Sequence, residues 1–225
     1  IGNQYFRYYK LANAEAITLS GQVSIRWIEQ RMNNYLNKIL KTEDIDYVIA
    51  SDTDSIYLHL GPLVENVFAS REKDDKSIVT FLNKVCEVEF EKYIEGSYQA
   101  LANYVNAYDQ KMFMKRETIA NKGIWTAKKR YILNAWDIEG VRFKEPQLKV
   151  MGIEAVKSST PAACRTAIKD ALKVIMNGTE EDAQKFIADF KEKFNALPPE
   201  NIAFPRGCNG VSLSLIHISE PTRPY

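Results

Sequence analysis

The sequence predicts an α+β fold, because helical and strand-like patterns mix up to about residue 155 and only helical patterns follow. Apolar residues recur at helical spacing in residues 14–40 and 78–108, which indicates two long amphipathic helices. Residues 46–60 and 128–143 each carry apolar runs on both sides of a short polar turn, as expected for β-hairpins. A chain of 225 residues with 45% hydrophobic content can form one large domain, or one domain and part of a second.

The remaining segments of the first 155 residues are expected to form a loop, a helix break, a strand and a hairpin turn. Residues 61–77 contain many charged residues and turn formers and are interpreted as a loop. The helix over 78–108 is expected to break near Gly96. Residues 111–120 alternate in polarity like a strand, and the hairpin that follows is expected to turn at Glu139-Gly140.

The last third of the sequence predicts two helices in succession. Thr160 is a candidate N-cap with Pro161 in the first turn, and Asn177-Gly178 is a typical helix end. Thr179 and Asp182 have the spacing of a capping box, so a second helix is expected to begin there.

Composition narrows the function classes. A formal net charge of +1 gives neither a strongly basic field nor an acidic tail. Three cysteines without a CxxC pair argue against a disulfide framework or a zinc site and favour a reducing compartment. The first residues do not have the pattern of a signal peptide, and no apolar run approaches about 20 residues, so we expect a soluble, intracellular chain. Its first residue, Ile1, is interpreted as a cut rather than a natural start.

Two aspartates, Asp52 and Asp54, lie at the expected turn of the first hairpin, between strongly apolar flanks. The simplest interpretation is a solvated turn, since aspartate is common in turns. The alternative is a Mg²⁺ site, because Mg²⁺ prefers hard oxygen donors on a rigid edge, and two such ions about 3.5–4 Å apart can assist phosphoryl transfer. That alternative requires a third carboxylate from elsewhere. Thr53 and Ser55 add small oxygen-bearing side chains to the same turn.

The segment "SDTDSIY" (51–57) resembles motif C of the B-family DNA polymerases, and neighbouring segments strengthen the resemblance. Four further segments follow one another in the same order as in polymerases of T4-like bacteriophages, so that the resemblance covers roughly residues 1 to 210. The segments are "GNQYFRYYKLANAEAIT" (2–18), "MFMKRETIA" (112–120), "WTAKKRYILNAWDIEGVRF" (125–143) and "GIEAVKSSTP" (152–161).

The resemblance implies roles for the acidic residues. Asp54 would bridge two catalytic Mg²⁺ ions, and Asp52 would shape the charge of the site. Thr53 and Ser55 would hold the turn. Glu117 matches a further palm carboxylate near the metals, whereas Lys115 stands where relatives often have an acidic residue.

The resemblance also implies a DNA contact at Lys128, Lys129, Arg130 and Tyr131, which match an element that grips the primer–template duplex. Independently, lysine and arginine can donate to minor-groove acceptors that all base pairs share, and can neutralise phosphates. Residues 115–149 hold nine Lys/Arg against four Asp/Glu, a local basic excess within a nearly neutral chain. The alternative is an ordinary solvated charge run.

The resemblance gives a domain division. Residues 1–157 would be the C-terminal part of the polymerase palm, with an antiparallel sheet and packed helices. Residues 158–212 would be the base of a partial, helical thumb, and residues 213–225 resemble translated sequencing adapter. The palm motif D-x-x-S-L-Y-P and the fingers motif K-x-x-x-N-S-x-Y-G do not occur in the 225 residues. We therefore expect the isolated chain to be inactive.

The predicted function is that of a fragment of a replicative, phage-encoded DNA-directed DNA polymerase, acting in the cytoplasm of an infected bacterium. Its implied partners are primer–template DNA and deoxynucleoside triphosphates. A sliding clamp would bind the intact parent, although the clamp-binding tail is absent from the sequence. Two alternatives remain open: a non-catalytic duplex-DNA-binding module, and a Mg²⁺-dependent nuclease-like enzyme based on the aspartate pair alone.

Overall fold

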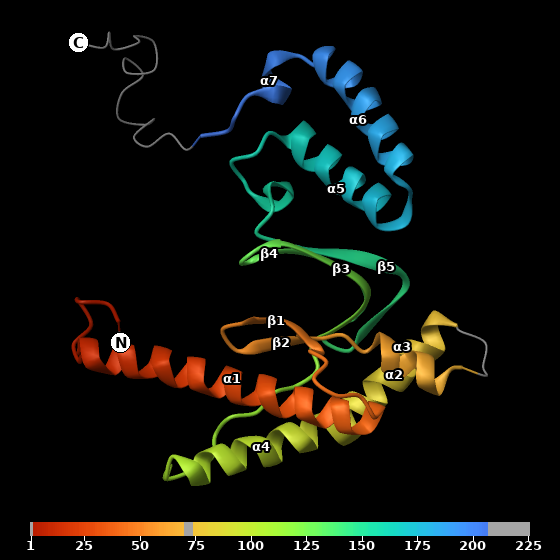
Figure 1. Cartoon of the computed structure of the whole chain (residues 1–225). Helices are drawn as coiled ribbons and strands as arrows, with labels where there is room; N and C mark the ends of the chain where they lie inside the picture. The colour runs from red at the N-terminus through yellow and green to blue at the C-terminus, as the bar shows by residue number, and fades with distance from the viewer. Residues whose placement is uncertain (1, 70–73, 207–225) are drawn as a thin grey trace. The chain divides into compact units, whose positions relative to one another are not determined.

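The structure is a computed structural model that describes residues 2–69 and 74–206. It mixes helices with antiparallel strands, which confirms the predicted α+β class (Figure 1). Its described residues divide into two compact units. Unit 1 comprises those up to Ala120 together with Trp136–Pro146, and unit 2 comprises Asn121–Ala135 together with those from Gln147 to Arg206. The interpretation of residues 213–225 as an adapter-derived tail lies outside the described residues.

Unit 1 is organised around α1 (Leu11–Leu40), the long helix expected over residues 14–40. Its buried side chains include Ile28, Met32 and Leu36, four positions apart, so one stripe of the helix faces the core. The hairpin expected over residues 46–60 is also present, with β1 (Val48–Asp52) antiparallel to β2 (Ser55–Leu58).

The segment between that hairpin and the sheet corrects two expectations. Residues 61–77 are not a single loop, because α2 (Gly61–Val67) and the start of α3 (Asp75–Val85) fall within them. Nor does the chain break at Gly96, which lies inside α4 (Glu91–Tyr104). Neighbours of Gly96 are buried, and their burial outweighs the roughly 1 kcal/mol cost of a helical glycine. The irregularity is instead a π-helical turn, Cys86–Phe90.

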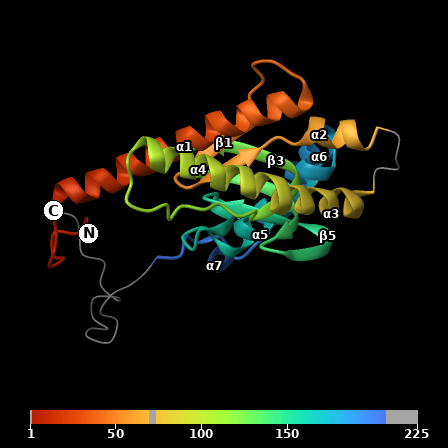
Figure 2. The same cartoon turned by 90° about the horizontal axis from the view of Figure 1, so that it is seen from below.

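The main core of unit 1 lies between α1, α4 and the β1–β2 hairpin, and α1 and α4 run side by side in both ribbon views (Figures 1 and 2). The Trp27 indole N–H donates to the Ser97 carbonyl at 2.9 Å, and the rings of Tyr35 and Tyr93 stack with centroids 4.1 Å apart. These two contacts join α1 to α4, and the hairpin packs on both helices because Tyr47 and Val48 belong to the same core.

The second sheet has the order β3 (Thr118–Ala127), β4 (Arg130–Ile138), β5 (Val141–Met151). Its two connections are two-residue turns, so adjacent strands are antiparallel. The predicted turn at Glu139-Gly140 is confirmed. The φ values of these two residues are +51° and +86°, which fit a type I′ turn, in which both central residues have positive φ. The strand expected over 111–120 begins only at Thr118.

Unit 2 adds a short 3₁₀ turn, Glu154–Val156, and three helices: α5 (Ala162–Asn177), α6 (Glu180–Asn195) and α7 (Pro199–Ile202). The predicted capping box of Thr179 and Asp182 is confirmed. Thr160 is not the N-cap of α5, because Pro161 occupies that position and Thr160 is buried. No described helix has the length and apolarity needed to span a bilayer.

Candidate functional site

The tip of the β1–β2 hairpin in unit 1 carries the aspartate pair. Asp52 pairs with Ser55 across the hairpin, so Thr53 and Asp54 form a two-residue turn. Thr53 has a φ of +53°, an unfavourable value for a β-branched residue. A turn held in that conformation needs local bonds to fix it.

Hydrogen bonds within the turn provide this support. The Asp54 amide and the Ser55 hydroxyl both donate to the Asp52 carbonyl oxygen, at 2.6 and 3.1 Å. The Thr53 hydroxyl donates to Asp52 Oδ1 at 3.0 Å, which orients that carboxylate. Asp54 is exposed and Asp52 is half-buried, so Asp54 is the more accessible of the two acids.

A buried tyrosine of α4, Tyr98, lies close enough to Asp54 to feel its charge. Burial raises the pKa of the Tyr98 phenol, and the nearby Asp54 carboxylate raises it further. Tyr98 is 3% exposed and belongs to the core on which the hairpin rests. Sequence analysis did not single it out, because it differs in no way from other apolar-face residues of a helix.

Asn33 of α1 fixes the start of the same hairpin and was also missed. Its side-chain oxygen accepts hydrogen bonds from the Tyr47 amide at 2.8 Å and the Val48 amide at 3.0 Å. Its side-chain nitrogen donates to Asp46 Oδ1 at 2.8 Å. The Asn33 side-chain amide thus provides the hydrogen-bond acceptor for two backbone N–H groups at the start of β1.

The hairpin tip offers the type of ligand that a hard divalent cation prefers, but too few such ligands to hold one. Asp52 and Asp54 provide carboxylate oxygens, which Mg²⁺ prefers. Within residues 2–69 and 74–206, no three His, Cys, Asp or Glu side chains are grouped so that they could hold a metal ion. Glu117 is therefore not brought into a three-carboxylate cluster with the aspartate pair.

Glu117 instead lines a separate hollow of unit 1 with a volume of about 600 Å³. Its side chain is exposed, and its backbone carbonyl accepts a hydrogen bond from the Glu139 amide at 2.6 Å. Lys115 lines the same hollow and is also exposed. The other charged lining residues are Glu87, Glu91, Arg116 and Glu139.

The basic element lies in unit 2, at the turn between β3 and β4. Lys128 and Lys129 form the turn and are exposed, and Lys129 has a φ of +60°. The Thr126 hydroxyl donates to the Arg130 carbonyl at 3.2 Å, and the rings of Tyr131 and Trp125 lie 6.4 Å apart. Two lysine ammonium groups are thereby presented on a tight, braced turn.

Arg130 differs from its neighbours because Glu154 holds it in an ion pair. The Glu154 pKa is lowered by a hydrogen bond from its own backbone, and then by Lys157 and Arg130. Lys157 approaches the other carboxylate oxygen at 3.1 Å. The Arg130 charge is thus partly neutralised within unit 2, whereas the lysines of the turn lie next to solvent.

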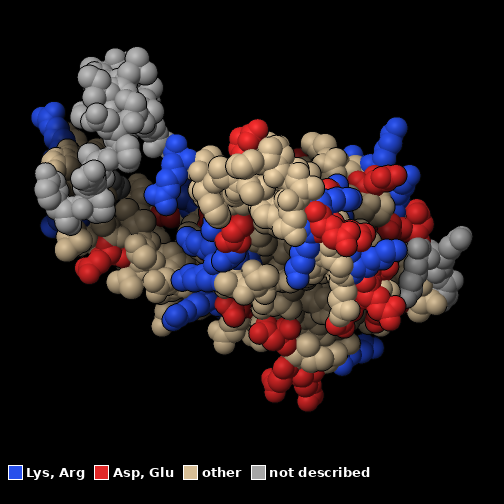
Figure 3. Space-filling view, turned by 90° about the horizontal axis from the view of Figure 1, so that it is seen from above, with Lys and Arg blue, Asp and Glu red and all other residues tan. Residues whose placement is uncertain are grey.

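On the face shown in Figure 3, Lys and Arg side chains are interspersed with Asp and Glu, and neither sign covers the whole face. This agrees with the formal net charge of +1. Any attraction for a polyanion must therefore come from local groups such as the β3–β4 turn, not from a general basic field.

Comparisons with known proteins agree with the resemblance drawn from the sequence. No protein-family model matches the chain. Over 94% of its length, however, the chain is similar to curated DNA-directed DNA polymerases. Two such relatives are the enzyme of Enterobacteria phage T4, 39% identical over 220 residues, and that of Escherichia phage RB69, 40% identical over 220 residues. The chain spans 24% of the length of each.

Proposed function

We propose that the chain is a fragment of a replicative DNA-directed DNA polymerase, in which residues 1–157 belong to the palm and residues 158–212 to the base of the thumb. The observation that carries the proposal is about 40% identity to two phage polymerases over nearly the whole chain. The hairpin tip with Asp52 and Asp54 supports it, because a braced acidic turn suits cation binding.

In the complete enzyme, Asp54 and Asp52 would contact two Mg²⁺ ions, with further ligands from elsewhere in the protein. When bound, the ions would neutralise charge that develops as a primer 3′-hydroxyl attacks a deoxynucleoside triphosphate. The exposed Asp54 carboxylate would make the more direct contact. The half-buried Asp52, oriented by the Thr53 hydroxyl, would set the local negative charge. Glu117 would act as an outer carboxylate.

The β3–β4 turn would contact the primer–template duplex through Lys128 and Lys129. Their ammonium groups can neutralise phosphates or donate to acceptors that every base pair presents in the minor groove, so the contact would be independent of sequence. Arg130, engaged with Glu154, and Tyr131, beside Trp125, would position the turn more than they would touch DNA.

The isolated chain is not expected to extend a primer, because it corresponds to about a quarter of its relatives and lacks the two motifs named above. The intact parent would act in the cytoplasm of an infected bacterium, together with a sliding clamp. Primer extension by the 225-residue chain alone would contradict this part of the proposal.

A binding measurement tests the DNA contact directly. Fluorescence anisotropy of a labelled primer–template duplex is followed for the wild-type chain, for Lys129→Ala, and for Lys38→Ala as the matched control. Lys38 is an exposed lysine in the last turn of α1, so its substitution removes the same charge elsewhere. We expect weaker binding only for Lys129→Ala, with affinity falling steeply between roughly 50 and 200 mM salt. Equal effects of the two substitutions would contradict the proposed contact.

The second candidate, a duplex-binding module without metal chemistry, is favoured by the exposure of Lys128 and Lys129 alone. Binding of Mn²⁺, followed by electron paramagnetic resonance of the free ion, distinguishes the two. The polymerase proposal expects Asp54→Asn to weaken Mn²⁺ binding, with Asp189→Asn, an exposed carboxylate of α6, as the control. Equal Mn²⁺ binding by both variants and the wild type would favour the module.

A further inference from the structure

A buried ion pair between Arg116 and Asp137 lies in unit 1, outside the residues that the resemblance implicates. Asp137 is 1% exposed and the Arg116 side chain is 10% exposed. Removing two charges from water is costly, and such pairs are often no more stabilising than apolar residues of the same size. We therefore expect this pair to fix the geometry of the groups that it binds.

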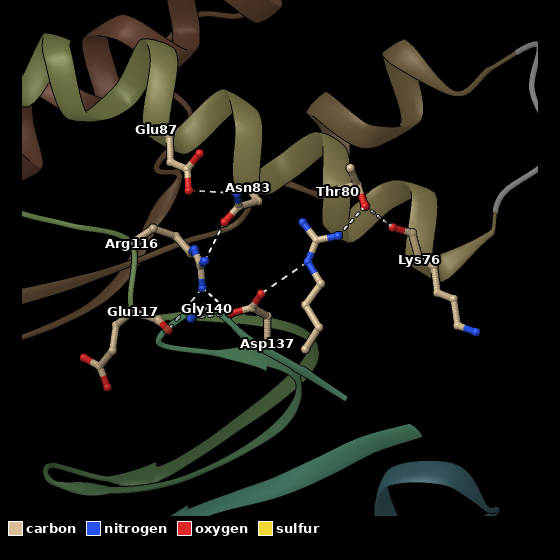
Figure 4. A network of polar contacts seen from close by, with 9 residues as sticks. Lys76, Thr80, Asn83, Glu87, Arg116, Glu117, Asp137 and Gly140 are labelled. Atoms are coloured by element: carbon tan, nitrogen blue, oxygen red, sulfur yellow. Dashed lines mark hydrogen bonds and ion pairs between the residues drawn. The ribbon is translucent and has the colours of Figure 1, made fainter. Parts of the chain in front are cut away.

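The Arg116 guanidinium reaches groups from three segments (Figure 4). It donates to the Asp137 carboxylate in β4, to the Asn83 side-chain oxygen in α3, and at 3.4 Å to the carbonyl of the next residue, Glu117. The Arg116 backbone amide donates to Glu91 Oε1 at 3.1 Å. The Arg116 amide, one residue before Glu117, and the Glu117 carbonyl are thus both hydrogen-bonded to neighbouring groups.

Asp137 extends the same restraint to the β4–β5 turn. Its Oδ1 accepts a hydrogen bond from the Gly140 amide at 3.0 Å, which braces the turn at Glu139-Gly140. The Glu139 amide of that turn donates to the Glu117 carbonyl at 2.6 Å. Both partners of the ion pair therefore act on one acceptor, the Glu117 carbonyl: Arg116 directly and Asp137 through the turn.

Helix α3 anchors this network at two positions of one face. Thr80 accepts a hydrogen bond from Arg142 Nη1 at 2.8 Å, and Arg142 Nε lies 3.6 Å from Asp137 Oδ2. Three residues further along α3, Asn83 binds Arg116. In Figure 4 the Glu117 side chain leaves this network in the direction away from Arg116 and Asp137. A fixed backbone therefore sets the direction in which the Glu117 side chain leaves the network.

We propose that Arg116 and Asp137 are positioning residues that hold the Glu117 backbone, so that its side chain starts from one location at the edge of the hollow. The functional meaning of that location rests on the proposed function, which makes Glu117 an outer carboxylate of the cation site. The positioning itself is a property of this fold and can be measured without a metal.

Amide hydrogen exchange provides the test. The variant Arg116→Met/Asp137→Leu replaces the pair by apolar side chains, an exchange that is often neutral for stability. We expect the Glu139 amide to exchange about tenfold faster or more, because its acceptor is no longer held. The amide of Ile94 in the α4 core should keep its protection. Asp170→Asn, which removes one carboxylate from the exposed Lys173–Asp170 pair, is the control and should change neither amide.

Two outcomes overturn the positioning proposal. Unchanged exchange at Glu139 would show that the pair does not hold Glu117, and equal acceleration at Glu139 and Ile94 would show a merely structural role. Arg116→Lys gives a second variant if the double substitution does not fold. It retains the charge but loses the forked geometry, so the Glu139 amide should show an intermediate rate, and a wild-type rate would contradict the proposal.

Paramagnetic broadening by Mn²⁺ separates this proposal from the proposed function. In the wild-type chain, the proposed function expects broadening of the Asp54 and Glu117 amide resonances. In Arg116→Met/Asp137→Leu, broadening should weaken at Glu117 and persist at Asp54. Absence of broadening in the wild type, together with the local change in exchange at Glu139, would contradict the cation site while supporting the positioning role.

Discussion

Gly152 passes so close to Lys129 that a β-carbon at position 152 would stand 2.1 Å from the Lys129 carbonyl oxygen. Gly152 also has a φ of +67°, a conformation that L side chains rarely adopt. The chain leaving β5 therefore packs directly against the turn that presents Lys128 and Lys129, and the shape of that turn depends on a glycine 23 positions later.

Gly152→Ala should destabilise unit 2 by about 2–4 kcal/mol, because a methyl group would meet backbone at a position where the φ value is also strained. Urea-induced unfolding followed by circular dichroism measures the change. Gly21→Ala is the control, since position 21 lies in α1 with nothing within 4 Å of an added β-carbon. That variant should gain roughly 0.5–1 kcal/mol. Equal midpoints for the two variants would contradict the close approach.

The sequence was most informative where a pattern was long or a turn was explicit. Helix α1 and both hairpins were predicted because their periodicities extend over many residues and their turn residues are characteristic. Helix α2 was missed because only Leu63 of its seven residues is buried, which leaves no periodic signal. Gly96 was misjudged because burial of its neighbours, a tertiary effect, outweighs the local propensity of glycine.

For the candidate site, the sequence placed Asp52 and Asp54 on one turn because their separation is local. It could not place Arg116 against Asp137, since 21 positions separate them and no spacing rule relates the two segments that hold them. The same holds for Glu154, 24 positions from Arg130, which changes how much of the basic run is available to DNA. Long-range pairing of charges follows from the fold and not from spacing.

Asn33→Ala should loosen the attachment of the hairpin to α1. The Tyr47 amide would lose its side-chain acceptor in a largely buried place, and the Val48 amide would keep only Asp46 Oδ1, at 3.1 Å, so the cost should be about 1–3 kcal/mol. Amide exchange at Tyr47 and Val48 should accelerate more than exchange at Ile94. Asn34→Ala, an exposed neighbour on the same helix, is the control and should leave both amides unchanged. Unaltered exchange in Asn33→Ala would show that water replaces the side chain without loss.

Cys86 should resist alkylation in the folded chain. Burial raises the pKa of its thiol to about 11, although the nearby Arg116 charge opposes this, and the thiolate is the reactive form. As pH rises from about 8.5, an unfolded chain releases the proton while the folded chain keeps it, so this group lowers stability with rising pH until about 11. Iodoacetamide labelling at pH 8, quantified by mass spectrometry in native and urea-unfolded chain, measures the protection. Equal labelling of Cys86 in both states would contradict it.

The capping box of α6 should make stability depend on acid. Hydrogen bonds from the Thr179 amide, and then from its hydroxyl, lower the Asp182 pKa. A lowered folded-state pKa contributes stability that is present above the unfolded pKa, near 4 for aspartate, and lost as pH falls through the folded value. Thermal midpoints of wild type and Asp182→Asn should therefore differ at pH 7 and converge below about pH 4. Asp189→Asn, in the middle of the same helix, should show no such convergence.

Glu154→Gln should strengthen duplex binding by unit 2. The substitution removes the carboxylate that pairs with Arg130 and accepts from Lys157, so two cations would become available to phosphates. Each new phosphate contact steepens the dependence of log affinity on log salt by about one, and anisotropy titrations at several salt concentrations measure that slope. Glu181→Gln, which removes an exposed carboxylate from the first turn of α6, controls for net charge. If both variants bind DNA equally well, the gain is a general charge effect and Glu154 does not restrain Arg130.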